Sequence, residues 1–192
     1  MQGDRLKIGV LALQGAVSEH MDSLQKCGAA AVAVRKTSDF AGLDGLIIPG
    51  GESTTIGRLS CLYGFREGIL AMAAQRKPIW GTCAGLILLA REVENQEPIL
   101  SLMSITVRRN AFGRQRESFE AELEIPVLGE EPFCGVFIRA PLILSVGEGV
   151  KILATFQGQI VAARERNLLA TSFHPELTED LRMHKYFLNM AL

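Results

Sequence analysis

The segment around Cys83 has the residue types and the spacing of a nucleophile in a tight turn. Residues 81–85 are Gly-Thr-Cys-Ala-Gly, and they lie between a segment that predicts a strand and one that predicts a helix. A sharp strand-to-helix turn crowds the nucleophile, so the residues two positions away must be small. The following helix N-terminus favours the thiolate over the thiol. The pattern therefore predicts a nucleophilic Cys83 at the carboxyl edge of a sheet, where open α/β sheets bind ligands.

The other three cysteines, Cys27, Cys61 and Cys134, lack this context, and we assign them to packing. The sequence has no C-x-x-C pair and no pattern of a small secreted domain. The N-terminal apolar segment, residues 8–13, is too short for a signal peptide or a membrane span. These features predict a reduced, cytoplasmic protein.

A cysteine nucleophile generally needs a base, and His174 is the histidine best placed to be one. It follows an apolar segment, residues 168–173, that predicts a buried strand, so it would emerge at the same sheet edge as Cys83. The other two histidines, His20 and His184, lie in the first and last predicted helices. We expect a solvated or a satisfied structural role for both of them.

Glu176 is the candidate for the group that orients this base. Pro175 keeps the preceding residue extended. Alternation along an extended chain would place the side chains of His174 and Glu176 on the same side. A metal site at His174, Glu176 and His184 is the weaker interpretation, because no H-x-x-x-H spacing or cysteine pair supports it. We expect neither a metal nor a cofactor.

A second loop has the composition of an oxyanion-binding turn. Residues 47–53 are Ile-Ile-Pro-Gly-Gly-Glu-Ser, so another predicted strand ends in a pair of glycines. Glycine lets the backbone approach a ligand closely. The N–H groups of Gly51 and Ala84 could then form a two-donor oxyanion hole. Taken alone, the loop favours the simpler interpretation, an ordinary turn between a strand and a helix.

The overall composition narrows the class of protein. The chain has 192 residues, 48% of them hydrophobic, with 20 basic and 21 acidic residues and a net charge of −1. This length and composition suit one compact domain, residues 1–192, with a well-buried core. The balanced charge gives no electrostatic reason to expect nucleic acid or an anionic membrane as a partner.

The predicted elements that must position these residues change character halfway along the chain. In the first half, strands at 6–13, 30–34, 46–48 and 78–81 alternate with helices at 16–26, 65–74 and 84–91, and Ser53 or Thr54 would cap one more helix after residue 52. In the second half, strands are predicted at 102–108, 119–125, 133–138, 143–146, 152–155, 159–163 and 168–173, before a final helix at 180–190. We therefore expect a three-layer α/β/α fold, with a mostly parallel central sheet and an antiparallel elaboration in the second half.

Six blocks of sequence in this order resemble the class I (triad) glutamine amidotransferases, and in detail the glutaminase subunits of pyridoxal 5′-phosphate synthase. They are LQGAV (13–17), PGGESTT (49–55), GTCAGL (81–86), RNAFGRQ (109–115), GVFIRAP (135–141) and SFHPELTED (172–180). The resemblance covers nearly the whole chain. Two departures are Ala111, where serine is more frequent, and Trp80, where a smaller apolar residue is usual.

The resemblance implies hydrolysis of L-glutamine to L-glutamate and ammonia. It also implies a partner, a (β/α)₈-barrel synthase subunit that uses the ammonia to build pyridoxal phosphate from a pentose phosphate and a triose phosphate, in a large complex.

The resemblance also assigns roles to residues. It implies a triad of Cys83, His174 and Glu176, and a glutamine site formed by Gly51, Glu52, Ser53, Arg109, Ile138 and Arg139. An arginine suits the α-carboxylate of a free amino acid, and Glu52 suits its ammonium group. For Gln14, the resemblance implies a place in a segment that faces the synthase and helps to organise the oxyanion loop.

Three other interpretations stay open at this point. The chain could be a triad glutaminase that serves histidine or purine synthesis, or a non-catalytic relative that acts in regulation. It could also be a cysteine protease or redox sensor on a similar fold, although this leaves the pairing of Glu52 with Arg139 unexplained.

Overall fold

The computed structural model describes residues 5–111 and 118–192. Within them the α-helices are α1 (Val17–Lys26), α2 (Ser53–Leu62), α3 (Phe65–Ala74), α4 (Ala84–Leu89) and α5 (Arg182–Asn189), and the short 3₁₀ helices are η1 (Thr37–Phe40), η2 (Pro126–Leu128) and η3 (Pro175–Leu177). The strands are β1 (Lys7–Leu11), β2 (Ala30–Val34), β3 (Gly45–Ile48), β4 (Ile79–Thr82), β5 (Ala90–Val93), β6 (Met103–Arg108), β7 (Ser118–Leu123), β8 (Phe133–Ile138), β9 (Leu142–Val146), β10 (Lys151–Phe156), β11 (Gln159–Glu165) and β12 (Leu168–Thr171).

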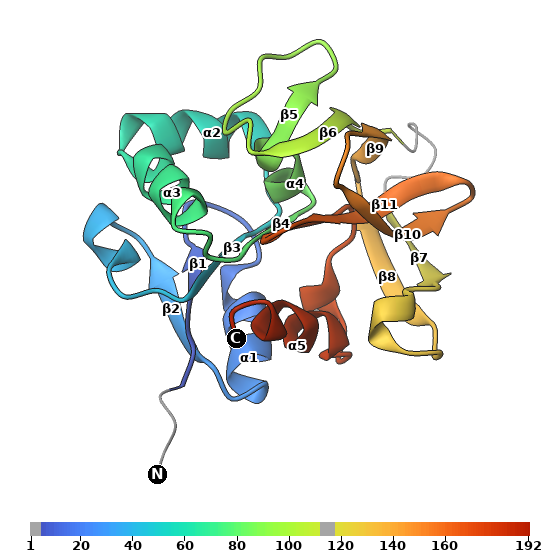
Figure 1. The fold of residues 1–192 in the computed structure, drawn as a ribbon, viewed down its shortest axis with the longest axis horizontal. Coiled ribbons are helices and arrows are strands. Elements are labelled where there is room, and N and C mark those ends of the chain that lie inside the picture. Colours follow the sequence, from blue (N-terminus) through green and yellow to red (C-terminus); the bar gives the residue numbers. More distant parts are fainter. Residues whose placement is uncertain (1–4, 112–117) are drawn as a thin grey trace.

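A large curled sheet with strand order β2-β1-β3-β4-β12-β11-β9-β6-β5 forms the middle of the molecule (Figure 1). The strands from β2 to β12 are parallel to one another. Beyond β12, the pairs β12–β11, β11–β9 and β9–β6 are antiparallel, and β10 pairs with β11 at the side. The predicted parallel sheet with an antiparallel second half is thus confirmed.

Helices cover both faces of the sheet, as the predicted three-layer fold requires (Figure 1). On one face α2, α3 and α4 bury a core that includes Ile56, Ile69 and Leu86. On the other face α1 and α5 pack over Trp80. β3, β4 and β12 are buried along their whole length, which is why, apart from the terminal Thr82 and Thr171, they are apolar rather than alternating.

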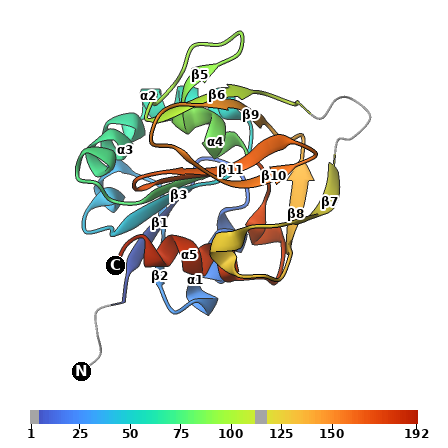
Figure 2. The ribbon, with the colours of Figure 1, turned by 45° about the vertical axis from the view of Figure 1, so that its right-hand side comes forward.

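The strands β7 and β8 form a separate two-stranded sheet beside the large one (Figure 2). Phe133 and Phe137 of β8 are fully buried and belong to the same core cluster as α1 and α5. β8 therefore ends close to the large sheet, and its last residue, Ile138, reaches the site described below.

The structure corrects several details of the predicted elements. The helix expected at 84–91 ends at Leu89, because the chain continues directly into β5, which was not predicted. The cap of α2 is Glu52 rather than Ser53 or Thr54, since the Glu52 carboxylate accepts hydrogen bonds from the backbone N–H groups of Thr54 and Thr55. The organisation of residues 1–192 as a single domain stays a prediction, and part of the predicted 109–115 block lies outside the described residues. None of the helices in the described ranges is long and apolar enough to cross a membrane.

Candidate active site

Cys83 occupies the turn between β4 and α4, with φ 48° and ψ −104°. A positive backbone φ is uncommon for any residue other than glycine. Strained backbone conformations of this kind cluster at functional sites. The two flanking glycines make the turn possible. A Cβ atom on Gly81 would overlap the backbone of Gly85, and one on Gly85 would overlap the carbonyl oxygen of Ile48 in β3. The predicted nucleophile turn is therefore present, and its tight packing explains both glycines.

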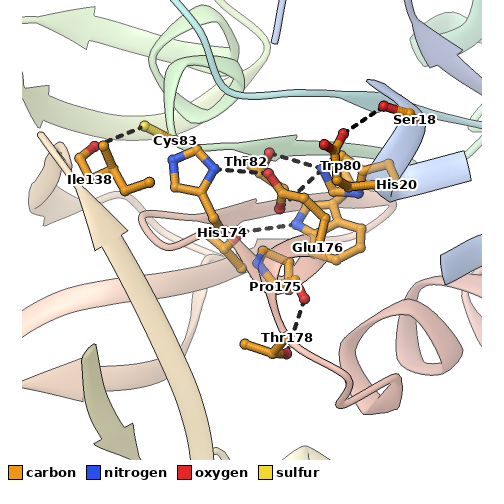
Figure 3. Close-up of polar contacts among 12 residues, drawn as sticks. Ser18, His20, Trp80, Thr82, Cys83, Ile138, His174, Pro175, Glu176 and Thr178 are labelled. Atoms are coloured by element: carbon orange, nitrogen blue, oxygen red, sulfur yellow. Dashed lines mark hydrogen bonds and ion pairs between the residues drawn. The ribbon is translucent and has the colours of Figure 1, made fainter. Parts of the chain in front are cut away.

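His174 and Glu176 meet behind Cys83 (Figure 3). His174 Nδ1 lies 2.8 Å from Glu176 Oε1, and the glutamate side chain has no exposed surface. The two side chains come together through the 3₁₀ helix η3, with Pro175 as its first residue, and not through alternation along an extended strand. The predicted pairing is present, but the backbone reason given for it was wrong, because β12 already ends at Thr171.

The electrostatics of the site favour a protonated His174. Burial lowers the pKa of His174, but hydrogen bonds and charge from Cys83 and Glu176 outweigh burial and raise this pKa to about 10. Burial also opposes ionisation of Glu176, yet its contacts with His20 and His174 hold the pKa of Glu176 below the usual value. His174 therefore keeps its proton at neutral pH beside the cysteine sulfur, which also lies 3.7 Å from the carbonyl oxygen of Ile138.

The loop of residues 49–51 closes over this array. A Cβ atom on Gly50 would overlap His174 Cε1. The Gly50 carbonyl oxygen in turn lies so near Gly15 that Gly15 could not carry a side chain. Gln14 holds the next peptide, because its Oε1 accepts a hydrogen bond of 2.8 Å from the backbone N–H of Glu52. The segment that follows β1 and the loop that follows β3 are thus locked together beside Cys83.

One cavity of about 380 Å³ joins these parts. All the residues predicted for catalysis, oxyanion binding, glutamine binding and loop organisation line it, except Glu176, which lies behind His174. The lining residues are Gln14, Gly51, Glu52, Ser53, Cys83, Ala84, Ile87, Arg109, Asn110, Ile138, Arg139 and His174. Ile87 and Asn110 were not predicted. Ile87 lies one helical turn after Cys83 and Ala84, and Asn110 directly follows Arg109.

The charged residues of the cavity are not equivalent. Arg109 forms an ion pair of 3.0 Å with Glu52 and also donates hydrogen bonds to Thr54 and Gln96. The Thr55 hydroxyl, together with the backbone N–H groups of Thr54 and Thr55, lowers the pKa of Glu52 to about 2 against the effect of burial. Arg139 has no hydrogen bond or ion pair with a described residue, so its positive charge faces the cavity uncompensated.

One prediction outside the cavity needs correction, that for Cys61, and the prediction for His20 is decided in favour of its buried, satisfied alternative. Cys61, assigned to packing, is exposed, because the buried face of α2 passes through Ile56, Gly57 and Ser60 and not through residue 61. His20 is completely buried, and its Nε2 lies 3.3 Å from Glu176 Oε2. The sequence did hold a signal for this burial, since His20 shares one face of α1 with Leu24, four residues later.

Comparisons with known proteins agree with this geometry. Residues 10–192 match the model of the SNO glutamine amidotransferase family. A protein of Geobacillus sp. (strain WCH70), named pyridoxal 5′-phosphate synthase subunit PdxT, is 60% identical over 187 residues, which cover 97% of each chain. A protein of the same name from Desulforudis audaxviator is 53% identical, over 97% of this chain and 99% of its own.

The solved structures give the same answer for the fold. The structure described as a glutamine amidotransferase has a TM-score of 0.90 and 48% identity, over 96% of this chain and 98% of its own. A putative GMP synthase protein from Thermoplasma acidophilum, at 20% identity and TM-score 0.74 over 99% and 96% of the two chains, shares the fold. With a matching family model, a matching fold and relatives identical at more than half of their positions, this chain belongs to the SNO glutamine amidotransferase family.

Proposed function

We propose that this protein hydrolyses L-glutamine to L-glutamate and ammonia, as the glutaminase subunit of pyridoxal 5′-phosphate synthase. The observation that carries the chemistry is the buried array of Cys83, His174 and Glu176 that opens into a single cavity. The choice of pathway is supported by the 60% identical Geobacillus protein, which is named as a subunit of that synthase. The similarity to the putative GMP synthase protein concerns the fold alone, at 20% identity.

The reaction proceeds through a thioester. The Cys83 thiolate attacks the side-chain amide carbon of glutamine, and the backbone N–H groups of Gly51 and Ala84 bind the oxyanion that forms. His174 gives its proton to the amide nitrogen, which leaves as ammonia. Neutral His174 then takes a proton from a water molecule that attacks the thioester. Release of glutamate restores the thiolate and the protonated histidine.

The remaining cavity residues bind the amino-acid end of glutamine. Arg139 offers its charge to the α-carboxylate, because no described residue neutralises it. Glu52 and Arg109 already share an ion pair, so each presents a partly compensated charge to the substrate. The backbone of Gly51 and Ile138 and the Ser53 side chain complete the site.

Replacing Ser53 with alanine tests this assignment without disturbing the fold. Ser53 is 2% exposed, and its Oγ has no hydrogen-bond partner among the described residues. Removing an unpartnered hydroxyl should leave the thermal unfolding temperature unchanged or higher, since no hydrogen bond within the protein is lost. If the hydroxyl binds glutamine, KM should rise about 10-fold, the value of one hydrogen bond. An unchanged KM would remove Ser53 from the substrate site.

The ammonia is delivered to a (β/α)₈-barrel synthase subunit in a multi-subunit complex, in the cytoplasm. Gln14 connects this partner to the chemistry, since it already holds the backbone N–H of Glu52 beside the oxyanion loop. A contact that reoriented Gln14 would move the peptide that follows Gly51, and with it one of the two oxyanion donors.

An ammonia-release assay with and without the synthase subunit tests the whole proposal. Glutamine turnover should rise sharply when the synthase subunit is added, and pyridoxal phosphate should form from glutamine and the two sugar phosphates. Absence of glutamine hydrolysis in both conditions would overturn the glutaminase assignment. Hydrolysis that is equally fast without the synthase would overturn the coupling alone.

A further inference from the structure

A pair of buried histidines lies on the side of Glu176 opposite His174. His20 of α1 has no exposed surface, and its Nε2 lies 3.3 Å from Glu176 Oε2 (Figure 3) and 3.3 Å from the Thr82 hydroxyl. Only the contact with Thr82 has the geometry of a hydrogen bond. The contact with Glu176 Oε2 is close but not well directed, and this oxygen accepts no hydrogen bond from the described residues. His20 Nδ1 lies 3.0 Å from Nε2 of His184, which comes from α5 and is also buried. The glutaminase reaction as described above uses neither histidine.

The surroundings select one arrangement of protons on this pair. A carboxylate only accepts hydrogen bonds, so an unprotonated His20 Nε2 would place two lone pairs 3.3 Å apart. His184 Nδ1 has no partner among the described residues, and a buried N–H without an acceptor is costly. Both penalties vanish when His184 Nε2–H donates to His20 Nδ1 and His20 carries its proton on Nε2. The two rings then direct one N–H bond toward Glu176 and Thr82.

Burial disfavours a second proton on either histidine, so their main effect on Glu176 is to orient it. The titratable groups that act on His20 are Glu176, His174, His184 and Glu19 of the same helix. Burial lowers the pKa of His20 more than the two glutamates raise it, and burial together with His20 lowers the pKa of His184 to about 3. Glu176 therefore keeps its full negative charge for the protonated His174.

We propose that His20 is a positioning residue of the triad: the Nε2–H edge of its ring lies against Oε2 of Glu176 as an electrostatic contact rather than a directed hydrogen bond, and His184 fixes the tautomer that presents this proton. With His174 Nδ1 on Oε1 and His20 Nε2 near Oε2, a donor faces each carboxylate oxygen. This fixes the rotation of the carboxylate, and hence the direction in which the His174 ring faces Cys83. The inference rests on the proposed glutaminase chemistry, and the experiment below separates the two.

Three substitutions of His20 isolate the atom that matters. In His20→Gln the amide nitrogen can occupy the place of Nε2, whereas in His20→Asn it reaches only the place of Nδ1. His20→Leu removes both donors. Phe187→Leu is the matched control, because Phe187 is a fully buried α5 residue that packs on Trp80 in the same core and touches none of the triad.

Two readouts are measured across pH for each variant. One is kcat/KM for glutamine, with the synthase subunit present. The other is the rate at which iodoacetamide alkylates Cys83, followed by peptide mass spectrometry so that the exposed Cys61 does not interfere. Alkylation reports on the thiolate–imidazolium pair and needs no substrate, so it remains informative if the protein does not hydrolyse glutamine.

His20→Leu and His20→Asn should lower kcat/KM by about 10- to 100-fold, the effect of removing a donor from a buried charged group. A less firmly held Glu176 raises the pKa of His174 less. The imidazolium is then lost at lower pH, so the alkaline limb of activity moves down. Cys83 alkylation should reach half of its plateau at higher pH, so the ion-pair window narrows from both ends. His20→Gln should recover most of the activity and the wild-type pH limits.

Phe187→Leu should reduce thermal stability and leave both pH profiles unchanged. Wild-type pH profiles in a folded His20→Leu protein would overturn the proposal, as would equal behaviour of His20→Gln and His20→Asn. If His20→Leu does not fold, the contrast between glutamine and asparagine decides alone. Absence of glutamine hydrolysis with an intact alkylation profile would count against the proposed function and not against the role of His20.

Discussion

Replacing Cys83 with alanine is expected to reduce ammonia release from glutamine by about 10⁵-fold or more, because no other group in the cavity can form the thioester. The effect on folding should be small. Alanine tolerates the φ of 48° no worse than cysteine does, and only one buried sulfur atom is removed. The free energy of unfolding should therefore change by no more than about 1 kcal/mol. Initial rates of ammonia release and a thermal melt provide the measurement.

The matched control is Cys61→Ala, which removes an exposed thiol from the outer face of α2. Its ammonia release should equal that of the wild type. Glutamine should still bind to Cys83→Ala, since the groups around Arg139 are untouched, and isothermal titration can check this. Ammonia release from Cys83→Ala at a rate near that of the wild type would show that Cys83 is not the nucleophile.

Replacing Gly50 with alanine should lower kcat/KM by about 10²- to 10³-fold and cost about 1–3 kcal/mol of stability, because the added Cβ overpacks a buried site. The new Cβ would overlap His174 Cε1 and lie 3.2 Å from His174 Nδ1 and 3.4 Å from Cys83 Cβ. Gly50 is not among the glycines with positive φ, so alanine meets no backbone penalty at this position. The methyl group acts by moving the imidazole, and a displacement of about 1 Å at a reacting group can cost about 10²-fold.

Gly158→Ala is the matched control, because it should cost stability without affecting activity. Gly158 has a φ of +77° and no atom within 4 Å of the added Cβ, far from the cavity lining. Alanine there should cost about 1 kcal/mol of stability and leave glutamine turnover unchanged. Equal turnover in Gly50→Ala and in the wild type would show that the loop of residues 49–51 can move away from the triad. It would then be poorly suited to hold a fixed oxyanion donor.

The parts of the site that could be predicted are those encoded by short spacing. The turn at Cys83 depends on glycines two residues to either side, and the pairing of His174 with Glu176 spans two residues. The parallel sheet was predictable for the same reason, because β3 is apolar along its whole length and β12 up to its last residue, Thr171. In each case the physical cause lies within a few residues.

The parts that could not be predicted depend on contacts between distant segments. His20 reaches Glu176 only because α1 and η3 pack on the same face of the sheet, with 155 positions between them in the sequence. The ion pair of Glu52 with Arg109 joins the start of α2 to the end of β6, and no spacing rule connects these segments. Glu52 is the helix cap because α2 already begins at Ser53, and the Glu52 carboxylate accepts hydrogen bonds from the N–H groups of Thr54 and Thr55. Local propensity alone does not weigh that option.

The origin of the cavity walls has a consequence for how this fold can change over time. Cys83 and the glycine loop follow strands of the large sheet, whereas Ile138 ends β8 of the small sheet and is followed directly by Arg139. Bond cleavage and part of the grip on the substrate thus belong to different sheets. A different hairpin in place of β7 and β8 would change the side of the cavity that faces the proposed nucleophile. The amide that the enzyme accepts could then change during evolution, while the residues that break the bond stay the same.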